Sequence, residues 1–375
     1  FTTDASLGAA GIGINLNNGT IGSVATVHPG PTSNRPVTIT DKGGFSVASA
    51  PLTWSGVIGG SGQLTKSGDG DLSLSAANTY GGGTTVTGGV LRFTNDVNLG
   101  AAGTAITLNG GAVGTTKDTP AATSIDRKIV LAGNGGIDVA LHPFIWSGSI
   151  SGGGRLIKSG DGEFELTGTN TYAAGTRVEE GVLRIASDAK LGAAGTHLNL
   201  DGGGGLSASA TFASTRPVWL TGARGIVLVD AGETLTLSGV VSESGALVKS
   251  GPGDLILSGA NTYSGGTTVT GGVLRFANDG NLGAAATGIM LNGGAVGTMT
   301  DTPAATSISR NITLASNGGG IDVAAQSQSL SWSGNISGNG GLFKIGAGTL
   351  VLTGNNTYAG GTQVAGGTLW VASDA

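Results

Sequence analysis

The fold is decided by the stretch Leu64-Thr-Lys66-Ser-Gly68-Asp-Gly70-Asp-Leu72-Ser-Leu74, which continues through Asn78-Thr79-Tyr80 and Gly83-Thr84-Thr85-Val86 to Val90-Leu91-Arg92-Phe93. The stretch returns three more times, and it holds all four tyrosines of the chain, at positions 80, 172, 263 and 358. By subtraction, these positions lie 92, 91 and 95 residues apart. A chain that repeats in this way is built by stacking equivalent units, so its function belongs to the array.

A second phrase marks where the units begin. Phe1-Thr-Thr-Asp4-Ala-Ser-Leu7 returns from Phe93, from Ile185 and from Phe276, and the last five residues of the chain open it a fifth time. The predicted units are therefore 1–92, 93–184, 185–275 and 276–375, the last of which includes the start of a fifth. Units one and three also share an Arg-Pro pair, at Arg35-Pro36 and Arg216-Pro217. We expect the chain to be a segment of something longer.

Composition indicates an all-β chain. Glycine supplies 74 of 375 residues, but it follows no strict period of three, which excludes collagen. The hydrophobic content of 38% is too high and too regularly placed for a disordered linker. What remains is a series of short Val, Leu, Ile and Thr runs between Gly, Asn, Asp and Ser, which predicts many strands and tight turns.

Charge and cysteine content exclude several classes of function. A net charge of −5 without a basic cluster excludes nucleic acid as a partner. The chain has no cysteine, which excludes disulfides and thiolate metal sites, and we predict no cofactor and no metal. The given sequence shows neither a signal peptide nor an apolar run of membrane-spanning length.

Each unit holds too many strand candidates for one turn of a superhelix. A coil of a parallel β-helix takes roughly 20 to 25 residues, so a unit suits about four coils and the chain about sixteen. Apolar residues alternate in the strand candidates, as at Leu72 and Leu74 and at Phe164 and Leu166, which places one face inward. The sequence therefore predicts one continuous parallel β-solenoid with glycine-rich corners. Its open strand edges at the two ends predict end-to-end self-association.

The repeated stretch resembles the passenger-associated transport repeat of bacterial autotransporters. Its clearest copy runs from Leu247 through Asn261-Thr262-Tyr263 to Leu274. Copy two departs by placing Ala174 where glycine is expected, and copy four by placing Thr349 after the second glycine. The resemblance covers about 30 residues in each of the four units.

The resemblance implies a right-handed parallel β-helical passenger, exported through the outer membrane of a Gram-negative bacterium by a C-terminal β-barrel translocator in the parent chain. It implies a location at the cell surface or outside the cell. It also implies a structural segment that supports secretion and folding, within proteins that act as adhesins toward unidentified host-cell or matrix surface molecules. The alternative is a polysaccharide-active enzyme, a lyase or a hydrolase, on a β-helix.

The predicted site is the repeat motif itself, without catalytic residues. We expect each tyrosine to pack at a coil corner with its hydroxyl bonded to the backbone, and each asparagine to bond the turn backbone. The competing interpretations are a ligand-binding aromatic and a sugar-binding amide. The predicted residues are Asn78, Thr79, Tyr80, Asn170, Thr171, Tyr172, Asn261, Thr262, Tyr263, Asn356, Thr357 and Tyr358, with the glycine pairs Gly68 and Gly70, Gly160 and Gly162, Gly251 and Gly253, and Gly346 and Gly348.

The lysine of each copy has two interpretations: a row that binds a polyanion, or outward side chains whose stems cover apolar surface. If the lysines stand in one row, neighbours lie ~19 Å apart, beyond a Debye length of ~8 Å, which favours the second interpretation. The four are Lys66, Lys158, Lys249 and Lys344.

The acids and histidines of the chain offer three further candidate sites: a calcium site, a glycosidase acid pair, and a catalytic triad or zinc site. Asp69 and Asp71 faintly resemble a calcium β-roll, but the acids do not persist along the chain. The equivalents of Asp69 are Asp161, Pro252 and Ala347, and those of Asp71 are Glu163, Asp254 and Thr349. The densest candidates for a glycosidase acid pair are Glu163, Glu165, Glu179 and Glu180, with Arg177 between, and their alternation favours a solvated face. No catalytic triad or zinc site is supported by the scattered His28, His142 and His197.

Overall fold

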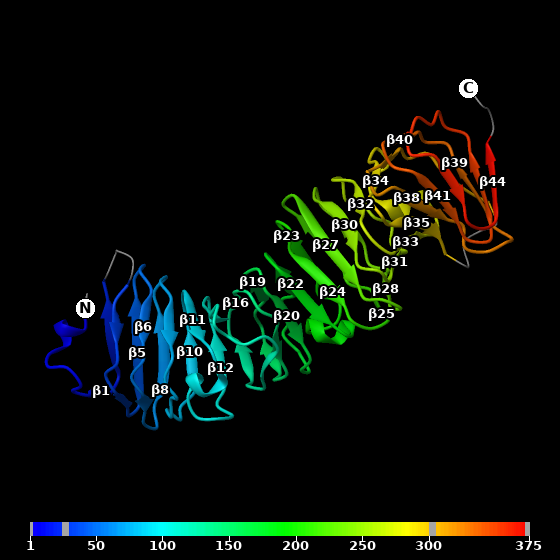
Figure 1. The fold of residues 1–375 in the computed structure, drawn as a ribbon. Coiled ribbons are helices and arrows are strands. Elements are labelled where there is room, and N and C mark those ends of the chain that lie inside the picture. Colours follow the sequence, from blue (N-terminus) through cyan, green and yellow to red (C-terminus); the bar gives the residue numbers. More distant parts are fainter. Residues whose placement is uncertain (1–2, 25–29, 300–304, 372–375) are drawn as a thin grey trace. The chain divides into compact units, whose positions relative to one another are not determined.

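The computed structural model describes residues 3–24, 30–299 and 305–371, and it confirms the predicted fold class. The chain is a parallel β-solenoid of about 17 turns with almost no helix (Figure 1). Among the described residues the helices are four short 3-10 turns, η1 (Asp4–Leu7), η2 (Asp96–Leu99), η3 (Asp188–Leu191) and η4 (Asp279–Leu282). The predicted opening of a fifth unit, beyond Val371, lies outside the described residues.

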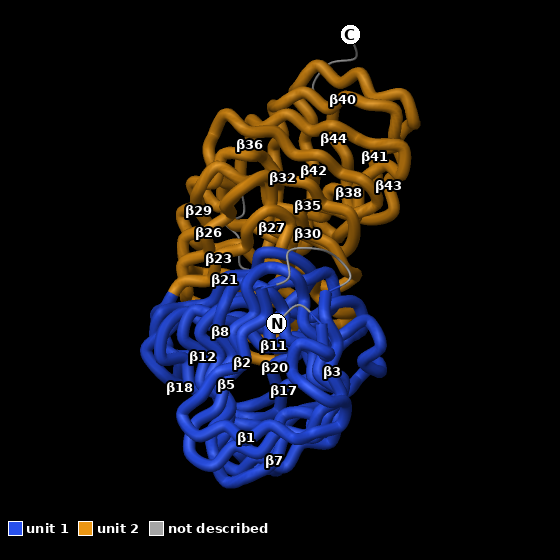
Figure 2. The backbone as a smooth tube through the Cα atoms, turned by 90° about the vertical axis from the view of Figure 1, so that its left-hand side faces the viewer, with its two compact units in different colours: residues 1–183, 189–196 blue, residues 184–188, 197–375 orange. Residues whose placement is uncertain are grey.

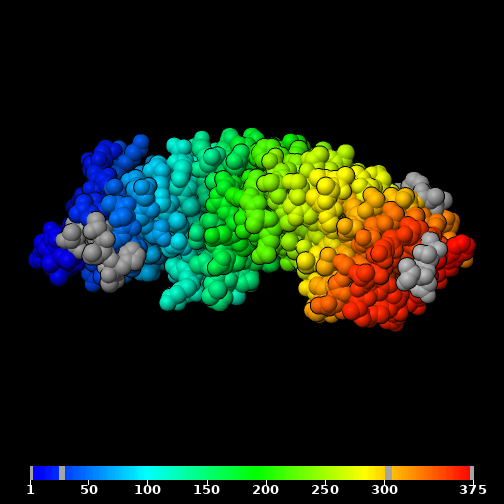
Figure 3. Space-filling view, turned by 90° about the horizontal axis from the view of Figure 1, so that it is seen from above, coloured from blue at the N-terminus to red at the C-terminus, as the bar shows by residue number. Residues whose placement is uncertain are grey.

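Contacts divide the chain into two compact units, residues 1–183 with 189–196 and residues 184–188 with 197–375 (Figure 2). In the space-filling view the colours of each unit change in sequence order, because each turn lies beside the next one along the chain (Figure 3). One turn takes in three strands. For example, β4 (Val37–Ile39), β5 (Lys42–Val47) and β6 (Leu52–Trp54) are followed by β7 (Ile58–Gly59), which pairs in parallel with β4.

The strands of unit 1 form four rows of parallel neighbours. The first two are β1 (Ile14–Leu16), β4 and β7, and then β2 (Gly19–Ser23), β5, β8 (Gln63–Ser67), β10 (Thr84–Val86), β12 (Ile106–Leu108), β15 (Ile129–Leu131) and β18 (Ile150–Gly152). The other two are β3 (Thr32–Ser33), β6, β9 (Leu72–Leu74), β11 (Val90–Phe93), β13 (Ala112–Thr115), β16 (Gly135–Asp138), β19 (Leu156–Ser159) and β21 (Thr176–Val178), and then β14 (Thr123–Ile125), β17 (Phe144–Trp146) and β20 (Glu163–Leu166).

Unit 2 repeats this arrangement. Its first two rows are β23 (Leu198–Asp201), β26 (Val218–Thr221) and β29 (Val241–Ser242), and then β24 (Gly205–Ala208), β27 (Arg224–Val229), β30 (Ala246–Ser250), β32 (Thr267–Val269), β34 (Ile289–Leu291), β37 (Ile312–Leu314) and β40 (Ile336–Gly338). The others are β25 (Phe212–Ser214), β28 (Thr234–Leu237), β31 (Asp254–Leu257), β33 (Val273–Phe276), β35 (Ala295–Thr298), β38 (Gly319–Asp322), β41 (Leu342–Ile345) and β43 (Thr362–Val364), and then β36 (Ala305–Ile308), β39 (Ser329–Trp332), β42 (Thr349–Leu352) and β44 (Thr368–Val371).

Equivalent residues move to the next row of strands from one repeat to the next. Lys66 lies on β8, whereas the equivalent Lys158 lies on β19, in the neighbouring row. Lys249 on β30 and Lys344 on β41 differ in the same way. About 17 turns over four repeats give 17/4, or about four and a quarter turns per repeat. Because this number is not whole, each copy of the motif lies further around the solenoid axis than the copy before it. The lysines therefore do not stand in one row.

The core follows the predicted alternation. Leu72 and Leu74 are buried with half-exposed Ser73 between them, and β20 buries Phe164 and Leu166 in the same way. Aromatic rings extend the core from turn to turn, since the Phe144 ring centroid lies 5.8 Å from that of Phe93 and 6.2 Å from that of Phe164. Continuous burial of this kind stabilises the coils without disulfides.

Candidate functional site

Each copy of the motif forms a corner in which the tyrosine lies inside the solenoid. Tyr80 is fully buried, and its hydroxyl lies 2.9 Å from Thr84 Oγ1. Its partner is thus a threonine side chain rather than the expected backbone. The same pair recurs at 2.6 Å between Tyr172 and Thr176, 2.8 Å between Tyr263 and Thr267, and 2.5 Å between Tyr358 and Thr362. Burial raises the pKa of Tyr80 and Tyr263 to about 12.

The tyrosine ring needs a glycine in the next coil. A Cβ atom on Gly100 would lie 2.6 Å from Cε2 of Tyr80, and Gly100 has a φ of +86°. Gly192 and Gly283 meet Tyr172 and Tyr263 in the same way. The Leu-Gly-Ala-Ala phrase therefore supplies the surface on which the tyrosine packs.

The motif asparagine links three successive coils. Asn78 Oδ1 accepts a hydrogen bond from Ile58 N at 2.8 Å, and its Nδ2 donates to Asn98 O at 2.6 Å. The equivalent contacts join Asn170 to Ile150 N and Lys190 O, Asn261 to Val241 N and Asn281 O, and Asn356 to Ile336 N. The side chains of Thr79, Thr171, Thr262 and Thr357 are exposed.

Replacing Asn261 by alanine is expected to lower the free energy of unfolding by about 1–3 kcal/mol, because a buried N–H and a buried carbonyl lose their partner. The neighbouring Thr262→Ala change is the matched control and should stay within about 0.5 kcal/mol of the parent, since its side chain is exposed. Urea unfolding measures both. Equal stabilities of the two variants would contradict the linking role of the asparagine.

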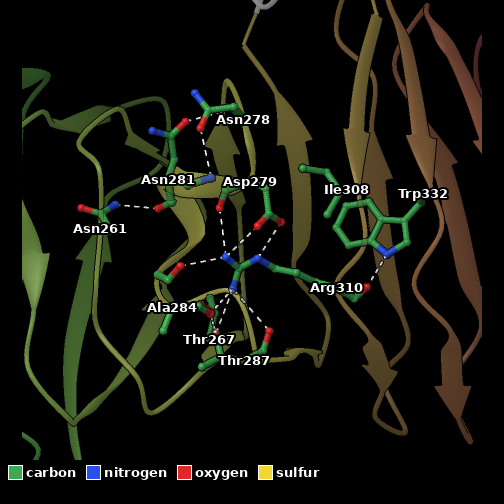
Figure 4. Close-up of polar contacts among 12 residues, drawn as sticks. Asn261, Thr267, Asn278, Asp279, Asn281, Ala284, Thr287, Ile308, Arg310 and Trp332 are labelled. Carbon is green, nitrogen blue, oxygen red and sulfur yellow. Dashed lines mark hydrogen bonds and ion pairs between the residues drawn. The ribbon is translucent and has the colours of Figure 1, made fainter.

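A buried arginine, which the sequence interpretation missed, holds each of the four 3-10 turns from the following coil. Arg310 Nε lies 2.8 Å from Asp279 Oδ1, and its other nitrogens donate to Gly283 O at 2.8 Å, Ala284 O at 2.8 Å and Thr287 Oγ1 at 2.9 Å (Figure 4). The arginine thus supplies donors to the carbonyl oxygens at the end of η4, of which Ala284 O also accepts from Thr287 N. Its own carbonyl accepts from Trp332 Nε1 at 2.7 Å.

The other three 3-10 turns carry the same contact. Arg127 holds η2 through Asp96, Leu99 O, Gly100 O and Ala101 O, while Arg35 pairs with Asp4 and Arg216 with Asp188. A regular spacing in the sequence points to these pairs. By subtraction, Asp precedes Arg by 31 residues in units one, two and four and by 28 in unit three. The Arg-Pro pairs of units one and three are part of this set.

The lysine of each copy is buried, so both sequence interpretations of it are wrong. Lys66 is 0% exposed, and its Nζ donates to Ser67 O at 3.0 Å, Gly68 O at 2.7 Å and Gly88 O at 2.9 Å. An ammonium has three hydrogens to donate, and the two glycine corners supply three acceptors. Lys158, Lys249 and Lys344 make the equivalent three contacts. Desolvation lowers the pKa of Lys66, Lys158 and Lys249 to about 8.

These pKa values predict how stability depends on pH. Between about 8 and the ordinary lysine value of 10.5 the unfolded chain binds more protons, so the free energy of unfolding should rise with pH in that window. Above pH 10.0 the tyrosines, raised to about 12, keep protons that the unfolded chain loses, and stability should fall again. Urea midpoints measured across this range test both limbs. In Lys249→Met the rise should be smaller, and a midpoint that only falls from pH 8 would contradict the prediction.

The glycine pairs shape the corners that hold the lysine. Gly68 has a φ of +75° and presents its carbonyl oxygen to Lys66. The equivalent φ values are +73° at Gly160, +73° at Gly251 and +78° at Gly346. A Cβ atom would lie 2.9 Å from a valine Cγ1 at Gly70, 2.6 Å at Gly162 and 2.5 Å at Gly348, and 2.1 Å from Asp230 O at Gly253.

The structure does not gather the predicted acids into one cluster. Glu163 and Glu165 lie half-exposed on β20, Arg177 Nε lies 3.2 Å from Glu179 Oε1, and Glu180 Oε2 accepts from Gly160 N. Asp71 pairs with Arg92 at 2.6 Å. His142 is exposed and the His197 ring stacks on Trp219 at 3.8 Å, while His28 lies outside the described residues.

The described part of the chain contains no group of three or more His, Cys, Asp and Glu side chains that could hold a metal ion. It also contains no helix long and apolar enough to cross a membrane.

Comparison with known proteins identifies the repeat. The model of the passenger-associated-transport-repeat matches residues 64–93, 156–185, 247–276 and 342–371. The chain is 35% identical over 332 residues to the adhesin BmaC autotransporter of Brucella suis biovar 1 (strain 1330), an alignment that covers 77% of this chain and 10% of that protein. Two extracellular serine proteases of Serratia marcescens match over 39 residues, at 67% and 62% identity, covering 10% of this chain and 4% of each protease. No solved structure matches the chain.

The chain thus spans a tenth or less of the length of these relatives. The matched repeats are the segments that carry the buried lysine in all four copies, and the buried asparagine and tyrosine in the first three. The chain belongs to the autotransporter passengers with passenger-associated transport repeats, which are secreted, cell-surface or extracellular proteins.

Proposed function

We propose that the chain is a structural segment of its passenger, which supports translocation and folding at the cell surface and displays adhesive regions. The observation that carries this proposal is the repeat corner. Asn261 bonds backbone of the coils on either side, and Arg310 reaches back to Asp279 in the coil before its own. A coil therefore completes its hydrogen bonds only against its neighbours, so a folded end serves as a template for the coil beside it.

The working units of this segment are the repeats with bounds 1–92, 93–184, 185–275 and 276–375. The motif residues of each repeat lock its corner, and none is proposed to act in catalysis. A C-terminal translocator domain of the parent chain is the proposed exporter.

The adhesive part of the proposal is supported by the relative named an adhesin, which aligns over 77% of this chain. Host-cell or matrix surface molecules are the proposed partners. The relatives named serine proteases align over only 39 residues. We therefore favour a structural and adhesive role over an enzymatic one.

The test is surface display of the parent protein carrying Arg310→Met. Because this change removes a contact between coils, the passenger should reach the surface more slowly, as measured by protease accessibility on intact bacteria. Arg275→Met, which alters an outward-facing, partly exposed arginine at the end of the preceding repeat, is the control and should be displayed normally. Display of Arg310→Met at the parent's rate, despite a lower stability of the isolated segment, would refute the link between coil templating and secretion.

A further inference from the structure

A hollow on the outer face of unit 2 distinguishes the fourth repeat. Its lining comes from β33, β35, β38 and β41, whose labels lie close together in Figure 1, and from the corners that precede β35 and β38. The volume is about 320 Å³, at the lower end of the range of about 300–1,000 Å³ for small-molecule pockets. None of the described side chains that line it is charged. We call this hollow the trough.

One row of side chains builds the trough. The pairing register places Val273, Ala295, Gly320 and Phe343 next to one another on four successive strands. Ala295 and Gly320, in the middle of the row, have its smallest side chains. A Cβ atom on Gly320 would lie only 2.9 Å from that of Ala295. The outer positions are three strand spacings apart, which is ~14 Å. The middle of the row therefore carries no long side chain of its own, the Ile345 Cδ1 atom lies 3.4 Å from the position of a Cβ atom on Gly320, and Phe343 forms the wall at one side.

Phe343 gives the trough an aromatic surface that the other repeats lack. It is 39% exposed, and a Cβ atom on Gly318 would lie 3.0 Å from its Cε2 atom. In repeat two the same row reads Val90, Ala112, Gly136 and Ile157, so the floor is kept while the wall is an isoleucine. A partly exposed aromatic ring at the wall of an uncharged hollow is suited to stack on a ligand ring.

Side-chain amides stand at the rim. Asn317, which lines the trough, donates from Nδ2 to Asn292 Oδ1 at 2.9 Å. This contact holds the two amides together and leaves Asn317 Oδ1 as an acceptor for a hydroxyl group. An apolar floor with a few oriented polar groups is the usual composition of a small-ligand site.

We propose that the trough binds one ring of a neutral saccharide, with the apolar face of the sugar on Phe343 and its hydroxyl groups toward the asparagine amides. The uncharged lining favours a neutral sugar over an acidic one. A peptide added as a strand is disfavoured, because β35 and β38 are already paired on both sides and offer no open edge. The proposal gives the adhesive role a ligand class and rests on that role for its biological meaning.

The experiment uses the 375-residue chain and saturation-transfer NMR with methyl glycosides of glucose, galactose, mannose and N-acetylglucosamine. At least one glycoside should receive saturation from the protein. Phe343→Ile, which copies the wall of repeat two, should weaken binding by about tenfold without changing the melting temperature.

Three results would overturn the proposal: no neutral glycoside is bound, Phe343→Ile binds as the parent does, or only glucuronate or an apolar dye is bound. Because binding by the isolated chain does not depend on export, these results leave the proposed role in secretion untouched. Failure of secretion in the Arg310→Met parent likewise says nothing about the trough.

Discussion

Arg310→Met is expected to lower the free energy of unfolding by about 3–5 kcal/mol, the cost of breaking a buried ion pair by removing one partner. The Arg310 side chain is 0% exposed, whereas that of Asp279 is 33% exposed. Methionine keeps part of the apolar stem but supplies no donors, so Gly283 O and Ala284 O lose the nitrogens that they contact. Most of the loss should arise at Gly283 O, since Ala284 O keeps the N–H of Thr287 and the carboxylate of Asp279 can turn to water.

Arg275→Met is the matched control for this variant. Arg275 also contacts two carboxylates, Asp254 at 2.6 Å and Asp322 at 3.0 Å, but its side chain points outward and is 21% exposed. A pair near water contributes about 0–1 kcal/mol, so the control should lose far less. Urea unfolding gives the two free energies, and hydrogen exchange should show faster opening at η4 in Arg310→Met only. A control as unstable as Arg310→Met would mean that burial of the arginine is not what matters.

The repeated stretch was sufficient to predict the solenoid but not the interior of its corners. Strand alternation depends on local sequence, so the inward positions of Leu72 and Leu74 follow from their spacing. The same rule places Lys66 inward beside Leu64, since the two lie two residues apart on β8. The general rarity of buried lysine argued against that placement.

What makes burial of the lysine acceptable is a long-range contact. Gly88 O, its third acceptor, comes from the next coil, 22 residues further along the chain. The hydrogen bonds of Arg127 to the end of η2 likewise depend on which coils are neighbours. The shift of equivalent residues to the next row of strands is also a long-range property. Each repeat makes slightly more than four turns, and that excess is known only when all strand pairings are known. The period of the sequence gives the number of residues in a repeat, but it does not give the position of that repeat around the solenoid axis.

Tyr263→Ala is expected to cost about 3–5 kcal/mol, because it removes a fully buried ring and leaves a cavity at the corner. The ring packs against Gly283, where a Cβ atom would lie 2.8 Å from it, and glycine cannot fill the space that the ring vacates. Tyr263→Phe removes only the contact with Thr267 Oγ1 and should cost about 1 kcal/mol.

Tyr358 provides the control for the ring itself. It has the same hydroxyl partner, a threonine four residues on, but it is only partly buried. Tyr358→Ala should therefore destabilise much less than Tyr263→Ala, although the two changes delete the same atoms. Hydrogen exchange should place the loss in Tyr263→Ala at the coils around β31 to β34, since each coil depends on its neighbours. If Tyr263→Ala kept the stability of the parent and lost binding to a glycan or a host surface instead, the tyrosines would be a recognition row and the corner would need another explanation.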